Sequence, residues 1–97
     1  MLRPKPQRLT EDRAEAIALQ VLAFVIADPA QSSRFLSLTG SSPDDLRGAA
    51  SSRELQTATL DYLLSDESLL LSFCQEAGID PSSIGPAYQL LAGRIDD

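Results

Sequence analysis

The carboxylate pairs are the residues of this sequence that come nearest to chemistry. Asp44 and Asp45 follow a Gly/Ser loop, TGSSP, and Asp66-Glu67 form a second pair. A metal site needs ligands that converge from several elements. Neighbouring residues of a helix instead point about 100° apart, and the helix dipole alone favours acids in a first turn. We therefore predict that both pairs serve helix N-termini and that the chain has no metal site.

Other reactive groups are few. The 97-residue chain has no histidine, which removes the commonest general base and metal ligand. Its single cysteine, Cys74, cannot form an intramolecular disulfide, and Glu76 beside it disfavours a reactive thiolate. TGSSP lacks the spacing and the lysine of a phosphate-binding loop. We predict no catalytic residue, no cofactor and no enzymatic activity.

One catalytic alternative stays open at this stage. A small-ligand or metal-dependent domain could use carboxylates from several helices, provided that they converge in one pocket. The set that the sequence offers for it is Glu54, Asp61 and Asp66. A metal that binds only the folded state would raise the melting temperature.

The charge distribution limits the partners. The net charge is −6, which argues against nucleic-acid binding because phosphate contacts need clustered Lys and Arg. Four of the eight basic residues lie in the first 13 positions: Arg3, Lys5, Arg8 and Arg13. We predict a flexible basic arm over residues 1–9, one helical domain over 10–93 and a loose acidic tail over 94–97.

Prolines, glycines and capping residues predict where helices begin and end. Thr10 suits the start of a long apolar helix that ends near Ala27, and Asp28-Pro29 starts the next helix, which stops at Gly40. Ser42-Pro43 opens a short helix with Asp45 completing a capping box. Hydrophobic residues recur at helical spacing, and no stretch alternates as a strand does.

The second half continues in the same manner. Ser51 and Glu54 form a second capping-box pattern, and Asp66 caps the following helix, which Gly78 closes. Asp80-Pro81 opens the last segment, which Gly85-Pro86 must kink or restart, and it ends near Ala92-Gly93. The fold class is therefore all-α, a compact bundle of five to six short helices.

These landmarks repeat at an offset of 38 residues. Asp28 falls on Asp66. The other matches, in chain order, are Leu22 on Leu60, Phe24 on Tyr62, Ile26 on Leu64, Phe35 on Phe73, Gly40 on Gly78, Pro43 on Pro81 and Leu46 on Ile84. Two pseudo-repeated three-helix units could pack around a two-fold axis or stack as a short solenoid. Alternatively, any small helical protein reuses the same caps at similar lengths.

The segments ALQVLAFVIAD, RFLSLTGSSPDDLR and LDYLLSDESLLLSFCQEAGIDP resemble a known family. It consists of small, mostly alphaproteobacterial helical proteins, classed as domain of unknown function 3572. The resemblance spans residues 14–92, and its most specific parts are Gly40 to Arg47 and Leu60 to Glu67. It implies a helical fold with an uninterrupted last helix, and it carries over no activity, ligand or site residue.

Surplus apolar surface is the feature that points to a function. The run Ala16–Ala27 has one polar residue, Gln20, so it is central to the bundle or faces another subunit. This run is too short to cross a bilayer, and it lacks the basic face of a helix that lies on a membrane surface. Acidic residues precede it, where an export signal would have basic ones, so we expect a cytoplasmic protein. We expect an interaction or scaffold module that forms a homodimer or binds an unidentified protein. The predicted interface residues are Leu19, Leu22, Ile26, Leu69, Leu70 and Leu71.

Overall fold

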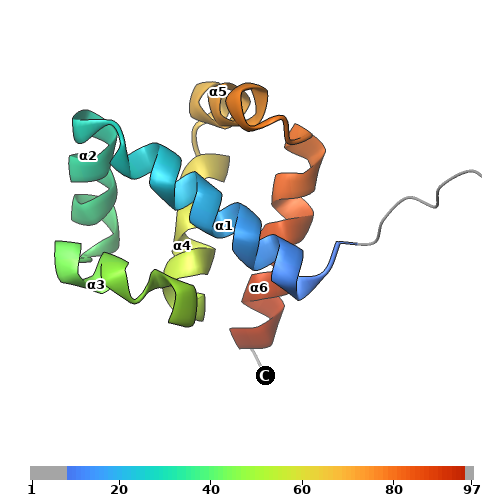
Figure 1. Cartoon of the computed structure of the whole chain (residues 1–97), viewed down its shortest axis with the longest axis horizontal. Helices are drawn as coiled ribbons and strands as arrows, with labels where there is room; N and C mark the ends of the chain where they lie inside the picture. Colours follow the sequence, from blue (N-terminus) through green and yellow to red (C-terminus); the bar gives the residue numbers. More distant parts are fainter. Residues whose placement is uncertain (1–8, 96–97) are drawn as a thin grey trace, which may run out of the picture.

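The computed structural model describes residues 9–95, and side chains as far as residue 93. The predicted basic arm therefore lies outside the described residues, except for Leu9, as does the end of the acidic tail. Six α-helices and two 3-10 turns follow one another, and the described residues contain no strand (Figure 1). The all-α prediction is confirmed. The elements are α1 (Glu11–Ile26), α2 (Pro29–Thr39), α3 (Pro43–Arg47), η1 (Ala49–Ser51), α4 (Arg53–Leu64), α5 (Glu67–Ala77), η2 (Pro81–Ser83) and α6 (Ile84–Ile95).

The caps form as the local sequence predicts. The Asp28 carboxylate accepts from the amide of Ala30 at 2.9 Å, and the Asp66 carboxylate accepts from that of Leu69 at 3.1 Å. Gly40 and Gly78, at φ 70° and 69°, end α2 and α5 in the left-handed conformation that glycine adopts without strain. The capping carboxylates lie two or three residues before the amides that they accept from, so local sequence determines these helix starts.

Removing a cap tests this account of the helix ends. The Asp66→Ala variant is expected to lose about 1 kcal/mol of unfolding free energy, because the Leu69 amide loses its acceptor. Asp66→Asn keeps an acceptor and should stay near the wild type. Urea denaturation followed by circular dichroism measures both variants. Equal losses in the two variants would show that charge, and not the capping hydrogen bond, holds this helix end.

Two boundaries differ from the sequence prediction. The cap of α4 is Ser52, whose hydroxyl accepts from the Leu55 amide at 3.1 Å, and Ser51 instead ends η1. At this register both Ala49 and Leu55 are buried. The last helix was expected to end near Gly93, but α6 continues to Ile95 because Gly93 does not adopt positive φ. Pro86 lies in the first turn of α6, where no amide donor is needed, so the predicted restart is confirmed.

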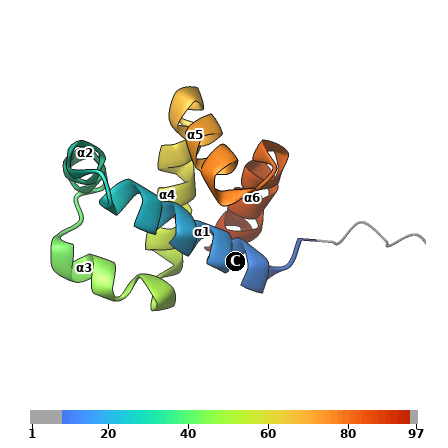
Figure 2. The ribbon, with the colours of Figure 1, turned by 45° about the horizontal axis from the view of Figure 1, so that its top comes forward.

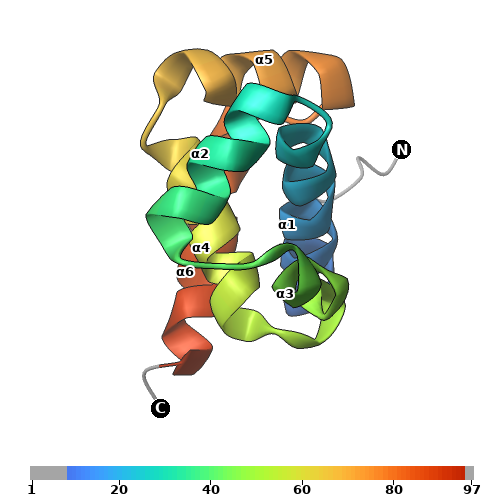
Figure 3. The same ribbon diagram turned by 90° about the vertical axis from the view of Figure 1, so that its left-hand side faces the viewer.

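The core forms around α1 and α4, which pack against each other and against α6 (Figures 1 and 2). The largest fully buried side chains come from five helices: Ile17, Val21, Val25, Phe35, Thr59, Leu60, Leu63, Phe73, Ile84 and Leu91. α5 lies across one end of the bundle, and α3 lies at the edge away from α6 (Figures 1 and 3). One helix of each half thus forms the centre of the molecule.

The offset of 38 residues is structural. α2 and α5 have bounds that differ by 38 at both ends, and α1 and α4 end 38 residues apart. The ring of Phe24 in α1 packs edge-on against Phe73 in α5, with centroids 5.4 Å apart. The equivalent pair, Tyr62 in α4 and Phe35 in α2, has the same T-shaped geometry at 5.3 Å.

These two ring pairs decide between the arrangements that the sequence left open. Each half places the aromatic residue of its first helix on the second helix of the other half. A rotation that exchanges the two halves turns one of these contacts into the other, which is what a two-fold axis requires. In a solenoid, where the second half is the first half moved along an axis, the second half would make its equivalent contact with a third unit and not with the first half. The third segments break the symmetry, since Leu46 is half-buried in the short α3 and Ile84 is fully buried in the long α6.

Candidate functional site

The Asp44-Asp45 pair serves the start of α3. The Asp45 carboxylate accepts from the Ser42 amide at 2.8 Å, and the Ser42 hydroxyl accepts from the Asp45 amide at 3.3 Å, which completes the predicted capping box. Asp44 lies 3.9 Å from Arg47 in an ion pair whose side chains are both more than four-fifths exposed. Such exposed pairs contribute little to stability. The two carboxylates therefore have separate local partners.

A cavity of about 590 Å³ is nevertheless lined by this loop. Glu54 of α4 faces the loop across the cavity, together with Thr39, Gly40, Ser41, Asp44, Asp45, Gly48, Ser52, Leu55 and Ala58. The acidic side chains make it unsuited to a phosphate. No group of three His, Cys, Asp or Glu residues within the described part of the chain could hold a metal ion.

The alternative carboxylate set is not brought together. Glu54 lines the large cavity, Asp61 lines a separate one between α2 and α4, and Asp66 caps α5. Because the three carboxylates lie at different places on the molecule, they do not form the convergent site that the catalytic alternative required.

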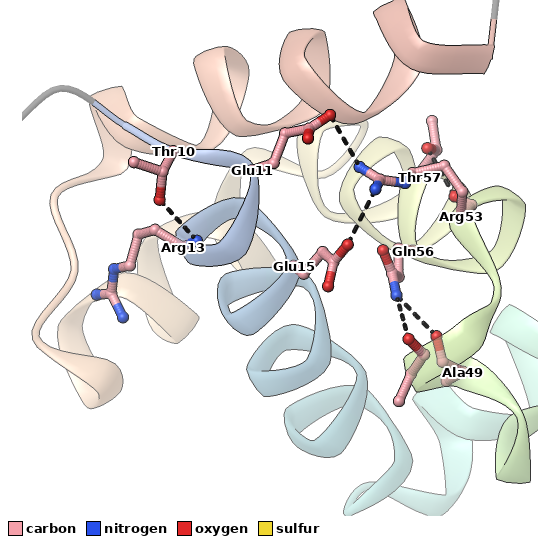
Figure 4. Close-up of polar contacts among 9 residues, drawn as sticks. Thr10, Glu11, Arg13, Glu15, Ala49, Arg53, Gln56 and Thr57 are labelled. Atoms are coloured by element: carbon pink, nitrogen blue, oxygen red, sulfur yellow. Dashed lines mark hydrogen bonds and ion pairs between the residues drawn. The ribbon is translucent and has the colours of Figure 1, made fainter.

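One ionic cluster has no pattern in the sequence that marks it. Arg53, at the start of α4, contacts Glu15 at 2.9 Å and Glu11 at 3.8 Å, and both acids belong to α1 (Figure 4). Arg53 and Glu15 are 38 residues apart, so this bridge joins equivalent positions of the two halves. Only the fold brings the two together. The side chains are about one-third exposed, which is consistent with a role in fastening α1 to α4.

The single cysteine is a core residue. Cys74 is 4% exposed on the inner face of α5. Burial raises the pKa of its thiol, and the negative charge of Asp80 raises it further. A raised pKa lowers the thiolate fraction, so the residue is poorly suited to act as a nucleophile.

An apolar groove runs between α1 and α5. Two adjoining cavities, of about 340 and 220 Å³, share Phe24, Ala27 and Glu76. We call this surface the α1–α5 groove and define it by all its lining residues, which are Gln20, Ala23, Phe24, Ala27, Asp28, Gln31, Leu69, Phe73, Glu76 and Ala77. Its base is the Phe24–Phe73 ring contact. Among these lining residues the charged ones are Asp28 and Glu76, and none is basic.

The two-fold relation places a second groove between α4 and α2. It is a cavity of about 290 Å³ lined by Leu38, Thr39, Ala58, Asp61, Tyr62 and Ser65. Each of these residues lies 38 positions from one that lines the α1–α5 groove. The second groove is more polar, because Asp61 and Ser65 stand where the first has Ala23 and Ala27. The apolar character therefore belongs to one groove of the pair.

The six predicted interface residues have different environments. Leu22 is 6% exposed and belongs to the core, so its place in a predicted interface is withdrawn. α1 buries a wide arc because it packs against α2, α4 and α6 together. Leu19, Leu69 and Leu70 are partly buried against the core, and Leu69 lines the α1–α5 groove. The two exposed members of the set are Ile26 and Leu71, at 38% and 49%.

No single helix within residues 9–95 is long and apolar enough to span a membrane. α1 and α2 meet the criterion of length and composition only as a pair, and the chain bends by 119° between them.

Comparison with known proteins assigns the chain to a family. Neither a curated protein nor a solved structure matches it. The model of one family, described as "Protein of unknown function (DUF3572)", matches residues 11–94, which include all six helices almost entirely. This match agrees with the resemblance of the helix-start segments noted in the sequence. The chain is therefore a member of the DUF3572 family.

Proposed function

We propose that the protein is a non-enzymatic interaction module that associates with a second copy of itself through the α1–α5 groove. The observation that carries the proposal is the composition of this groove, whose apolar lining comes from two phenylalanines, three alanines and a leucine: Ala23, Phe24, Ala27, Leu69, Phe73 and Ala77. Concave apolar surfaces of this kind favour protein contacts because covering them removes apolar area from water. The proposed location is the cytoplasm.

The surroundings of the groove support the same proposal. α1 has no charged residue between Ala16 and Ala27, although 23% of all residues are charged. Ala23, Ala27 and Ala77 are exposed and small, so a second helix can approach closely. Ile26, the last residue of α1 and the neighbour of Ala27 in the chain, is a further exposed apolar side chain. A partner can therefore bury apolar atoms here without burying basic groups.

A charge placed in the groove tests the proposal. The Ala23→Asp variant is expected to weaken self-association at least about tenfold, because a carboxylate left unpaired in an apolar contact costs more than the 1.4 kcal/mol that a factor of ten represents. Ala23 is exposed, and Asp61 occupies the equivalent position of α4, so we expect the fold to accept an aspartate at position 23. Sedimentation equilibrium over micromolar concentrations measures the association constant.

The matched control adds the same charge elsewhere. Gln89 is exposed on α6 and lines neither cavity of the groove, so Gln89→Glu should associate as the wild type does. A wild-type protein that stays monomeric at high micromolar concentration would refute self-association. Equal weakening by Ala23→Asp and Gln89→Glu would refute the groove as its site.

A further inference from the structure

One side chain of α2 stays largely uncovered, although it lines the edge of the α4–α2 groove. Leu38 is 66% exposed, more than any other large hydrophobic residue that the structure describes. Arg34 lies one helical turn before it on the same face, and it is also exposed. We call these two residues the α2 ridge.

The surroundings of the ridge make it suitable for close packing. Ala30, Ser33 and Ser37 are the other exposed residues beside it, and they are small. α2 contains no acidic residue, although the chain has a net charge of −6. Arg34 makes no ion pair with any side chain that the structure describes. The ridge thus offers one apolar and one cationic group.

The α1–α5 groove has the complementary features. Its apolar cavity of about 340 Å³ is lined chiefly by alanine and phenylalanine side chains, and its charged residues, Asp28 and Glu76, are both acidic. A leucine can enter the cavity while an arginine one turn away reaches a carboxylate at the edge. Paired in this way, both partners avoid leaving a charge unmatched at the contact.

We propose that the α2 ridge of one copy sits in the α1–α5 groove of a second copy, with Leu38 in the cavity and Arg34 beside Glu76. This inference rests on the proposed self-association and specifies what each copy contributes to it. Asp28 and Gln31, at the start of α2, line one end of the groove, so ridge and groove share a helix. Two copies related by a two-fold axis can then exchange both contacts and close as a dimer.

The competing arrangements match either the charges or the apolar surface less well. If the grooves of two copies packed against each other, Glu76 and Asp28 of one copy would face the same two acids of the other, with no cation to balance them. The α4–α2 groove, which Leu38 of its own copy also lines, would set the incoming Leu38 against Asp61 and Ser65, at the positions where the α1–α5 groove has alanines. Charge and apolar surface both match in the ridge-to-groove contact.

Mixing two defective variants tests the exchange directly. Leu38→Glu removes both ridges of a homodimer, and Ala23→Asp removes both grooves, so each variant alone is expected to lose at least tenfold in association. A mixture of the two restores one intact contact, between the ridge of Ala23→Asp and the groove of Leu38→Glu. Sedimentation of the mixture, with one variant fluorescently labelled, should therefore show a heterodimer. A mixture that stays as monomeric as its components overturns the proposal.

Charge reversal provides an independent arm. Arg34→Glu and Glu76→Arg should each weaken association severalfold, and the double variant should recover most of the loss, because the pair is re-formed with exchanged signs. Additive losses in the double variant overturn the pairing. Circular dichroism verifies that each variant is folded, as expected for exposed positions. If the wild type associates but neither restoration occurs, only the seating of α2 fails. A monomeric wild type removes the proposed function as well.

Discussion

The Phe73→Ala variant is expected to lose about 3–5 kcal/mol of unfolding free energy, which is a large fraction of the stability of a domain this size. Phe73 is 2% exposed and packs edge-on against Phe24 at 5.4 Å. Its removal leaves a cavity between α5 and α1 that the surrounding helices can fill only in part. Chemical denaturation followed by circular dichroism measures the loss.

The two-fold relation makes this prediction sharper. Phe35 is the equivalent residue, fully buried against Tyr62 at 5.3 Å, so Phe35→Ala should cost a similar amount. Gln89→Ala is the control, since an exposed side chain outside the groove and the ridge contributes within about 0.5 kcal/mol. A loss below about 1 kcal/mol in either phenylalanine variant would contradict the crossed packing of the two halves.

Truncating Gln56 is expected to have the next largest effect, a loss of about 2–3 kcal/mol. Gln56 is 2% exposed, and its side-chain amide donates to the carbonyls of Ala49 and Ala50 at 2.9 and 3.2 Å (Figure 4). Gln56→Ala removes two hydrogen bonds, each worth about 0.5–1.5 kcal/mol, and leaves a cavity where the side chain was. The Ala49 carbonyl keeps the Ser52 amide as a donor at 3.1 Å.

Two further variants separate the causes of this loss. Gln56→Leu retains the volume and removes the donor, so it should lose nearly as much as Gln56→Ala if the hydrogen bonds dominate. Gln75→Ala, at an exposed position of α5, should be neutral. If Gln56→Leu matches the wild type in urea denaturation, packing and not hydrogen bonding holds η1 against α4.

The helix ends could be predicted from the sequence because their hydrogen bonds are local. Asp28, Ser42 and Asp66 each accept from an amide two or three residues ahead, so a short segment contains the donor and the acceptor. The exception is Ser52, where two neighbouring serines could both cap α4. With Ser52 as the cap, Ala49 and Leu55 are both buried, and their burial depends on the packing of the whole bundle and not on the local sequence.

The contacts between the halves could not be predicted in the same way. Arg53 meets Glu15 across 38 residues and Tyr62 meets Gln31 across 31, and neither pair has a sequence pattern that marks it. Leu22 was expected at a surface because a single helix buries one stripe, but the neighbours of α1 cover a wider arc. The offset of 38 residues was the one long-range signal in the sequence. It relates the two grooves to each other, but only the structure shows which helix faces are left exposed to form them.

Dilution of the wild-type protein in solution NMR tests the central claim, which is that the α1–α5 groove is covered by a second copy. The methyl signals of Ala23, Ala27 and Ala77 are expected to shift with concentration, as are those of Leu38 on α2. The fully buried Ala14 and Ala87 serve as internal controls and should stay unchanged. Signals from the groove that do not move between micromolar and millimolar protein, or shifts confined to residues outside the groove and the ridge, would contradict the account.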